Sequence, residues 1–328
     1  MRCSSPVSLD TNGARTMSET MIGTAEDSDS IPVISGATPL TADRLADLSQ
    51  LHPAAVRLAG ITVRQRNTGR FLDAHENSAN DFRLVTRPTQ NNDSQRWQFV
   101  QVGLLVTVRQ KVNGRFLDAY ESNGQDFRMV TREAQNNDSQ RWVLRPAGGN
   151  HFTMQQLVNG RYADAYESNG QDFRLVTREW QNNDSQRWLV TSVGGNAYTV
   201  QQKVNGRYMD AYESGSNDYE VVTREWQNND SQRWLIDVTA GVYTIQQASN
   251  GRYVDAYESD GQDFRLVTRE AQNNDSQRWV LLPSTAGSFT IQQLVNARFV
   301  DAHEDSAHDF SVVTRPAQNN DSQRWILG

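Results

Sequence analysis

The chain has 328 residues, with 32 basic and 39 acidic side chains, a formal net charge of −7 at pH 7 and 37% hydrophobic residues. An acidic chain of this length has room for about two domains and lacks the basic surface that nucleic-acid binding needs. No run approaches the roughly 18 apolar residues of a membrane helix, and a single cysteine, Cys3, excludes internal disulfides and cysteine-based metal sites.

The first residues differ in composition from the rest. Residues 1–58 are predicted to be a disordered tail, because their first two thirds are rich in Ser, Thr, Gly and Asp. Within the tail, a short amphipathic helix is predicted near 41–52, between Thr41 as N-cap and Pro53 as stop. The start of the chain shows no ordinary secretory signal, so we expect a cytoplasmic location or secretion by a non-classical route.

From Ile61 onward the sequence repeats itself six times. The string NNDSQRW occurs in every unit, at intervals of 45 or 46 residues, and ends at Trp97, Trp142, Trp188, Trp234, Trp279 and Trp325. These tryptophans are predicted core residues, and the glutamine two positions earlier is a predicted buried amide bonded to turn backbone.

Each unit is predicted to form four short strands. In the fifth unit the segments 242–247, 251–258, 263–270 and 277–282 alternate apolar and polar residues, and β-branched and aromatic types are frequent. The breaks between them are dense in Gly, Asn, Asp and Ser, which favour turns. The region is therefore predicted to be all-β, as two three-unit β-trefoils or as one six-bladed β-propeller.

The order of motifs within a unit decides between these folds. In the fifth unit, G-R-Y-V-D-A at 251–256 precedes F-R-L-V-T-R at 264–269 and N-D-S-Q-R-W at 274–279. This order resembles the ricin-type β-trefoil repeat, with its G-x-C-L-D-V strand and closing Q-x-W. The resemblance implies a lectin with three units per trefoil and a shallow sugar pocket near each unit. It favours two tandem β-trefoils, at 61–196 and 197–328.

One pattern favours the six-bladed β-propeller instead. After duplication of a finished trefoil, unit one would most resemble unit four. Units one and six share the string DAHE and an Arg-Pro pair, at Arg87-Pro88 and Arg315-Pro316. The first and last blades of a ring, or the two caps of a linear array, would show such a likeness.

Candidate ligand residues lie on the strand 251–258. The position of Val254 is apolar in every unit and is predicted to face the core, so alternation turns Asp255 and Tyr257 outward. A carboxylate beside an aromatic ring offers an acceptor for sugar hydroxyls and a flat apolar surface, although a salt-bridged surface would look the same. The predicted ligand-binding residues are Asp73, Asp118, Asp164, Asp210, Asp255, Asp301, Tyr120, Tyr166, Tyr212, Tyr257, His75 and His303.

The sequence departs from the family's pattern in two respects. The aromatic residue that stacks on sugar in ricin-type lectins is absent from its expected position, which is occupied by Val267 in unit five. The family's cysteine pair falls on Tyr253 and Arg269, for which we hypothesise a cation–π contact in place of the disulfide.

Two tryptophans break the repeat. Trp180 and Trp226 occur only in units three and four, eight residues before the repeat tryptophan of each unit. Each is predicted to form either an interface or a ligand platform. The interface is favoured, because units three and four would meet at the junction of the two tandem trefoils.

The sequence gives no sign of catalysis. Its five histidines are scattered, and no Ser–His–Asp set or Gly-rich phosphate loop is present. We therefore expect a non-catalytic, multivalent carbohydrate-binding protein without cofactor or metal, whose partners are glycans or glycoconjugates, with a protein partner as a further possibility. The alternative is a structural or protein-binding trefoil, as in fascin-like actin bundlers, without a sugar site.

Overall fold

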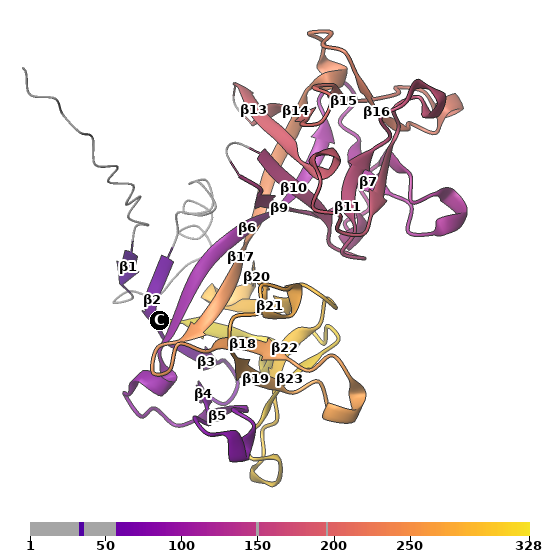
Figure 1. Cartoon of the computed structure of the whole chain (residues 1–328). Coiled ribbons are helices and arrows are strands. Elements are labelled where there is room, and N and C mark those ends of the chain that lie inside the picture. Colours follow the sequence, from indigo (N-terminus) through magenta and orange to yellow (C-terminus); the bar gives the residue numbers. More distant parts are fainter. Residues whose placement is uncertain (1–32, 36–56, 149–150, 195) are drawn as a thin grey trace, which may run out of the picture. The chain divides into compact units, whose positions relative to one another are not determined.

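Figure 1 shows the computed structural model of the chain, which describes residues 33–35, 57–148, 151–194 and 196–328. Across these residues the regular structure consists of β-strands and three-residue 3₁₀ turns, which confirms the predicted all-β class. In unit five the four strands β17 (Trp234–Gln247), β18 (Tyr253–Ala256), β19 (Leu266–Arg269) and β20 (Trp279–Pro283) overlap the predicted segments.

The remaining strands are β1 (Val33–Ser35), β2 (Arg57–Ile61), β3 (Val63–Gln65), β4 (Phe71–Ala74), β5 (Leu84–Arg87), β6 (Trp97–Gln110), β7 (Phe116–Ala119), β8 (Met129–Arg132), β9 (Trp142–Pro146), β10 (His151–Gln156), β11 (Tyr162–Ala165), β12 (Leu175–Arg178), β13 (Trp188–Gly194), β14 (Ala197–Gln202), β15 (Tyr208–Ala211), β16 (Val221–Arg224), β21 (Phe289–Gln293), β22 (Phe299–Ala302), β23 (Val312–Arg315) and β24 (Trp325–Leu327). The 3₁₀ turns are Ser78–Asn80, Asp93–Gln95, Asn123–Gln125, Asp138–Gln140, Asn169–Gln171, Asp184–Gln186, Gly215–Asn217, Asp230–Gln232, Asp260–Gln262, Asp275–Gln277, Thr285–Gly287, Ser306–His308 and Asp321–Gln323.

The six units form two main cores, and a third, smaller cluster contains Leu105 and Val143 of unit two with Val242 and Val280 of unit five. The repeat tryptophans are fully buried, as predicted. Those of units one, five and six share one core, and those of units two, three and four share the other. We call these groups the outer trefoil (57–103 with 241–328) and the inner trefoil (104–240). Two β-trefoils of three units each are thus confirmed, and the six-bladed propeller is not supported.

Backbone hydrogen bonds close each trefoil into a cycle. In the outer trefoil a threonine N–H of each unit donates to a phenylalanine carbonyl of another, all at 2.9 Å: Thr86 to Phe310, Thr314 to Phe264 and Thr268 to Phe82. The inner trefoil repeats the cycle at 2.9 Å with Thr131 to Tyr219, Thr223 to Phe173 and Thr177 to Phe127. The predicted domains 61–196 and 197–328 are therefore wrong, since each would combine units from both cycles.

Two long strands carry the chain between the trefoils. Strand β6 serves as the last strand of unit one and the first of unit two, and β17 does the same for units four and five. The two strands pair antiparallel along their length, with bulges near Val238 and Val242 (Figure 1). At the crossing, a Cβ on Gly103 would lie 2.9 Å from the carbonyl oxygen of Leu144, and one on Gly241 would lie 2.5 Å from the Tyr243 ring. Close packing thus requires glycine at both positions.

The segment before the repeats is only partly described. The predicted helix at 41–52 and most of the predicted tail lie outside the described residues. Arg57 and Leu58, which the tail was predicted to include, belong to strand β2, and Leu58 is fully buried in the outer core. No helix in the described part of the chain is long and apolar enough to cross a membrane.

Candidate functional site

The repeated aspartate is buried in every unit, with an exposed fraction of 3% or less. Asp255 Oδ1 accepts from the N–H of Ala256 at 2.8 Å, and Oδ2 accepts from Gln277 Nε2 at 3.2 Å. Arg269 covers the carboxylate, with Nε 3.8 Å from Oδ2. The outward orientation predicted for this aspartate is therefore wrong, whereas the predicted buried role of the glutamine is confirmed.

The burial of the aspartate recurs in all units, and the hydrogen bond from the glutamine recurs in units one and two. The buried equivalents of Asp255 are Asp73, Asp118, Asp164, Asp210 and Asp301. In unit three burial raises the pKa of Asp164, because hydrogen bonds from Ser185 and the charge of Arg178 offset only part of the desolvation. These buried carboxylates therefore stabilise the backbone and turns of their own units.

The aromatic residue two positions after the aspartate connects neighbouring units. Tyr257 donates to Asp81 Oδ2 at 2.8 Å, and Arg265 Nη2 lies 3.0 Å from the same oxygen. Asp81 adopts a left-handed conformation, with φ of 52°, at the end of a 3₁₀ turn, and this conformation turns it toward the neighbouring unit.

This contact is present at all six ring positions. The other rings and their partner carboxylates are Tyr120 with Asp218, Tyr166 with Asp126, Tyr212 with Asp172, His75 with Asp309 and His303 with Asp263, at 2.6 to 3.0 Å. The rings are half-buried, so part of each remains accessible. The tyrosines and histidines that were predicted to bind ligand therefore connect neighbouring units within each trefoil.

Arginine–aromatic contacts reinforce the same cycle. Arg252, from the G-R-Y motif, lies over the ring of Phe82 in unit one at 3.9 Å, and its equivalents in all units make the same contact. The hypothesised pair of Tyr253 with Arg269 is opposite across the hairpin, but the guanidinium lies over Tyr257 instead, 4.7 Å from the ring centroid. The predicted cation–π partner is therefore wrong.

The buried position of Asp255 yields a prediction for its replacement. In Asp255→Asn one of the two accepting carboxylate oxygens becomes an NH₂ group, which cannot accept a hydrogen bond. We therefore expect the free energy of unfolding to fall by about 1 to 3 kcal/mol. Denaturant unfolding followed by circular dichroism measures this loss. Tyr257→Phe is the control, because it removes one half-buried hydroxyl contact and should cost less, about 0.5 to 1.5 kcal/mol. Equal stability of Asp255→Asn and wild type would contradict the structural role.

Two of the predicted residues, His75 and His303, line accessible pockets. His75 borders a pocket of about 450 Å³ beside unit one, together with Arg87, Asn92 and Ser249. Asp73 does not line this pocket, because Arg87 and Gln95 lie against its carboxylate. The accessible polar groups around unit one are thus His75, Arg87 and the Asn-Asn-Asp-Ser turn.

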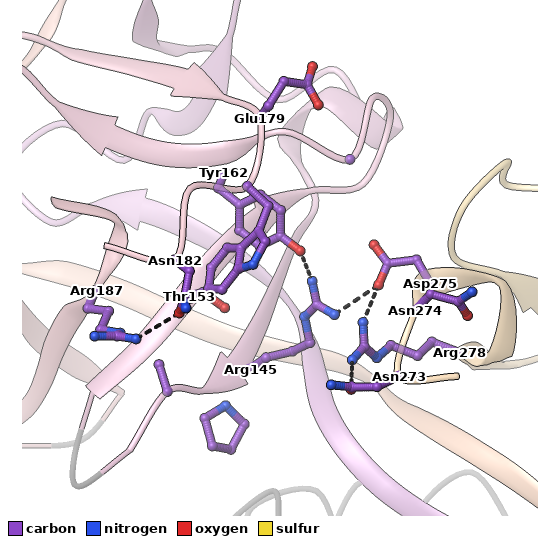
Figure 2. Close-up of a pocket in the computed structure, with 14 residues that line it drawn as sticks. Arg145, Thr153, Tyr162, Glu179, Asn182, Arg187, Asn273, Asn274, Asp275 and Arg278 are labelled. Carbon is purple, nitrogen blue, oxygen red and sulfur yellow. Dashed lines mark hydrogen bonds and ion pairs between the residues drawn. The ribbon is translucent and has the colours of Figure 1, made fainter. Parts of the chain in front are cut away.

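A larger pocket, of about 640 Å³, lies between units three and five (Figure 2). Trp180 lines it with 49% of its surface exposed, and packs on Tyr162 of its own unit with ring centroids 5.0 Å apart. Asn182, Glu179 and Asn274 supply polar groups from the two sides. The pocket therefore combines an anchored indole face with hydrogen-bonding side chains.

Buried charges form the floor of this pocket. Arg145 donates to Asp275 Oδ1 at 2.9 Å, to Gln155 and to the Tyr162 hydroxyl, and Arg278 pairs with the same Asp275 (Figure 2). Burial raises the pKa of Tyr162 above its ordinary value. Two guanidinium groups share one carboxylate here, so the floor carries excess positive charge.

Trp226 provides an internal comparison for Trp180. It packs on Tyr208 with centroids 4.9 Å apart and is 47% exposed, but it does not line the pocket. Units three and four lie in the same trefoil, so the predicted reason for a junction contact, that these two units meet there, is wrong. Trp180 nevertheless faces the outer trefoil across the pocket, whereas Trp226 does not line it. Each indole instead packs on the tyrosine of its own unit and presents a free face.

The sequence matches the family described as ricin-type beta-trefoil lectin domain-like over residues 55–131, 138–223 and 184–268. A comparison with curated proteins gives no match. Solved structures with a similar fold include the designed threefold-symmetric protein ThreeFoil, with 18% identity over 40% of this chain and 96% of that one, at a TM-score of 0.38.

Two lectins are also similar in structure. The Macrolepiota procera ricin B-like lectin, solved with lactose, shows 20% identity over 42% of this chain and 97% of its own, with a TM-score of 0.34. The hemolytic lectin CEL-III shows 13% identity over 69% of this chain and 64% of its own, with a TM-score of 0.34.

Proposed function

Because the chain belongs to the ricin-type β-trefoil lectin domain-like family, we propose that it binds carbohydrate without catalysis and that the Trp180 pocket is its main glycan site. The half-exposed indole is the observation that carries the proposal. An aromatic face packs against the C–H groups of a sugar ring, and Asn182, Glu179 and Asn274 can bond its hydroxyls. A volume of about 640 Å³ lies within the range of small-ligand sites.

The His75 pocket is proposed as a second, weaker site. It offers polar groups but no indole, which agrees with a smaller contribution to affinity. Two weak sites on one chain would bind a multivalent glycan surface with about 10²-fold higher avidity than either site alone. A cytoplasmic location, or non-classical export, stays a prediction.

Trp180→Ala tests the proposal directly. The full chain is screened on a glycan array, and the best ligand is then titrated by calorimetry. Loss of the indole face should weaken binding at least about tenfold, because stacking contacts of this kind contribute about 1.5 kcal/mol. Trp226→Ala is the matched control, since it removes an equally exposed indole outside the pocket and should leave affinity unchanged.

Three outcomes would contradict this site. Equal loss in both variants would indicate a general effect of indole removal, and no loss in Trp180→Ala would move binding elsewhere. An empty array from folded protein would favour the alternative of a protein-binding scaffold.

A further inference from the structure

Unit six carries a group of metal-ligating side chains that the other units lack. His303, Asp305 and His308 each offer a ligand atom, and these atoms lie within 4.8 Å of one another. The His303 and His308 rings stack at 4.4 Å with an interplanar angle of 11°. Three potential ligands from one hairpin therefore lie close together, and one ring must rotate out of the stack for both imidazoles to direct their in-plane lone pairs at one ion.

The turn geometry brings these groups together. Asp305 caps the 3₁₀ turn Ser306–His308 by accepting from the backbone N–H of His308, and the same carboxylate lies 2.7 Å from His308 Nδ1. Asp263, from unit five, lies 3.0 Å from His303 Nε2. Asp263 and Arg315 both contact His303 at Nε2, so Nδ1 is the nitrogen that remains for a ligand. A carboxylate beside the second nitrogen is common behind metal-bound histidines.

Carboxylates and guanidinium groups both surround these three side chains. Asp260, Asp263 and Asp309 border the hollow of about 390 Å³ that contains both histidines, and Asp305 adds a fourth carboxylate. Three guanidinium groups oppose them: Arg83 and Arg265 line the hollow, and Arg315 Nη2 lies 3.3 Å from His303 Nε2. Two more guanidinium groups act on the same carboxylates, Arg298 on Asp260 and Asp263 and Arg70 on Asp309. The ligand types, rather than the net charge, therefore support a metal here.

We propose that His303, Asp305 and His308 bind one zinc-like divalent ion, with water completing its coordination. Two imidazoles and one carboxylate are ligands that Zn²⁺ accepts and that Ca²⁺ and Mg²⁺ disfavour. Neighbouring ligands of tetrahedral zinc lie about 3.3 Å apart, given bonds of about 2.0 Å, so the group must contract slightly. His308 and Asp305 have 57% and 55% of their side chains exposed and are free to move.

Unit one has an equivalent turn without the proposed metal ligands and can therefore be compared with unit six. It has His75 at the position of His303, but Asn77 and Asn80 replace Asp305 and His308. Asn77 caps its turn in the same way, by accepting from the N–H of Asn80 at 3.0 Å. Units two to five have tyrosine at the histidine position. Unit six therefore differs from unit one at two positions of the proposed site, and the turn is capped in the same way with either pair of residues.

The test is titration of the full chain, without a polyhistidine tag, with zinc chloride by calorimetry. We expect one equivalent bound per chain, a higher melting temperature with zinc and none of these effects with calcium. His308→Asn should weaken zinc binding at least about tenfold, as loss of one of three protein ligands predicts, while leaving the circular dichroism spectrum and the metal-free melting temperature unchanged. Asn77→Asp with Asn80→His should add a second equivalent.

Unchanged affinity in His308→Asn would overturn the proposal, because binding would then depend on other groups such as Cys3 or His52. Absence of zinc binding to wild type at millimolar concentration would overturn it as well. A double variant in unit one that folds but binds one equivalent would show that these three ligands are insufficient.

Discussion

A fragment spanning residues 104–240 is expected to fold alone, whereas a fragment spanning 61–196 is expected to remain largely unfolded. The first contains units two, three and four, which share one core and one closed cycle of backbone bonds. The second combines unit one with only two units of that cycle. A trefoil without its third unit leaves a core face in water, and each exposed core side chain costs about 1.5 to 3 kcal/mol.

Thermal unfolding and amide dispersion in NMR spectra distinguish the fragments. A chain of 241–328 joined through a short glycine linker to 57–103 is the matched control, because Gly328 and Thr62 already exchange backbone hydrogen bonds. It should fold as the outer trefoil. Cooperative unfolding of 61–196, or its absence in 104–240, would contradict the observed grouping.

Asp275→Ala is expected to destabilise the full chain by about 3 kcal/mol or more. Asp275 is a carboxylate shared by Arg145 and Arg278, and the side chains of all three are less than a fifth exposed. Removing one partner of a buried ion pair leaves the other charge uncompensated, which costs about 3 to 5 kcal/mol. Asp321→Ala is the control, because its equivalent carboxylate is 42% exposed and its loss should change stability little.

The Asp275 carboxylate is also expected to make the free energy of unfolding depend on pH. Burial raises the pKa of Asp275, but Arg145, Gln155 and Arg278 lower it by more, so the pKa lies below its ordinary value. A native pKa below the unfolded one adds stability above pH of about 4, and this stability is lost as the pH falls through the native value. The difference between wild type and Asp275→Ala should therefore shrink below pH 4. A constant difference from pH 7 to pH 3 would contradict this assignment.

The strands, the buried tryptophans and the two trefoils could be predicted because each depends on local alternation and on a motif in every unit. The repeated motif alone could not show which units share a trefoil, although another feature of the sequence distinguishes them. The sequence has Gly-Gly-Asn at 148–150 and 194–196 and Ser-Thr-Ala-Gly at 284–287 after the repeat tryptophans of units two, three and five. At the corresponding positions of units one and four, β6 and β17 continue without a break. Boundaries between trefoils fall where the turn is missing, and units one and six resemble each other as members of one trefoil.

The binding residues were predicted from strand alternation, which distinguishes only two faces. In a trefoil hairpin the second face is also covered, because Arg269 lies over Asp255 and Tyr257 reaches Asp81 of another unit. Contacts of this kind join residues up to 234 positions apart, as His75 and Asp309 are, and a local sequence pattern cannot show them. The Trp180 pocket could not be predicted for the same reason, since four of its 14 lining residues come from unit five.

In the sequence, the inner trefoil lies between unit one and unit five of the outer trefoil, and this order affects how the chain folds during synthesis. The inner trefoil is complete once residue 240 has left the ribosome, so it can fold while the rest is being made. The outer trefoil must wait for its last strand, since Thr62 bonds to Gly328 across 266 positions. During that interval the apolar residues of unit one have no partner units, and this is the stage at which we expect the nascent chain to be most exposed to aggregation and to chaperones.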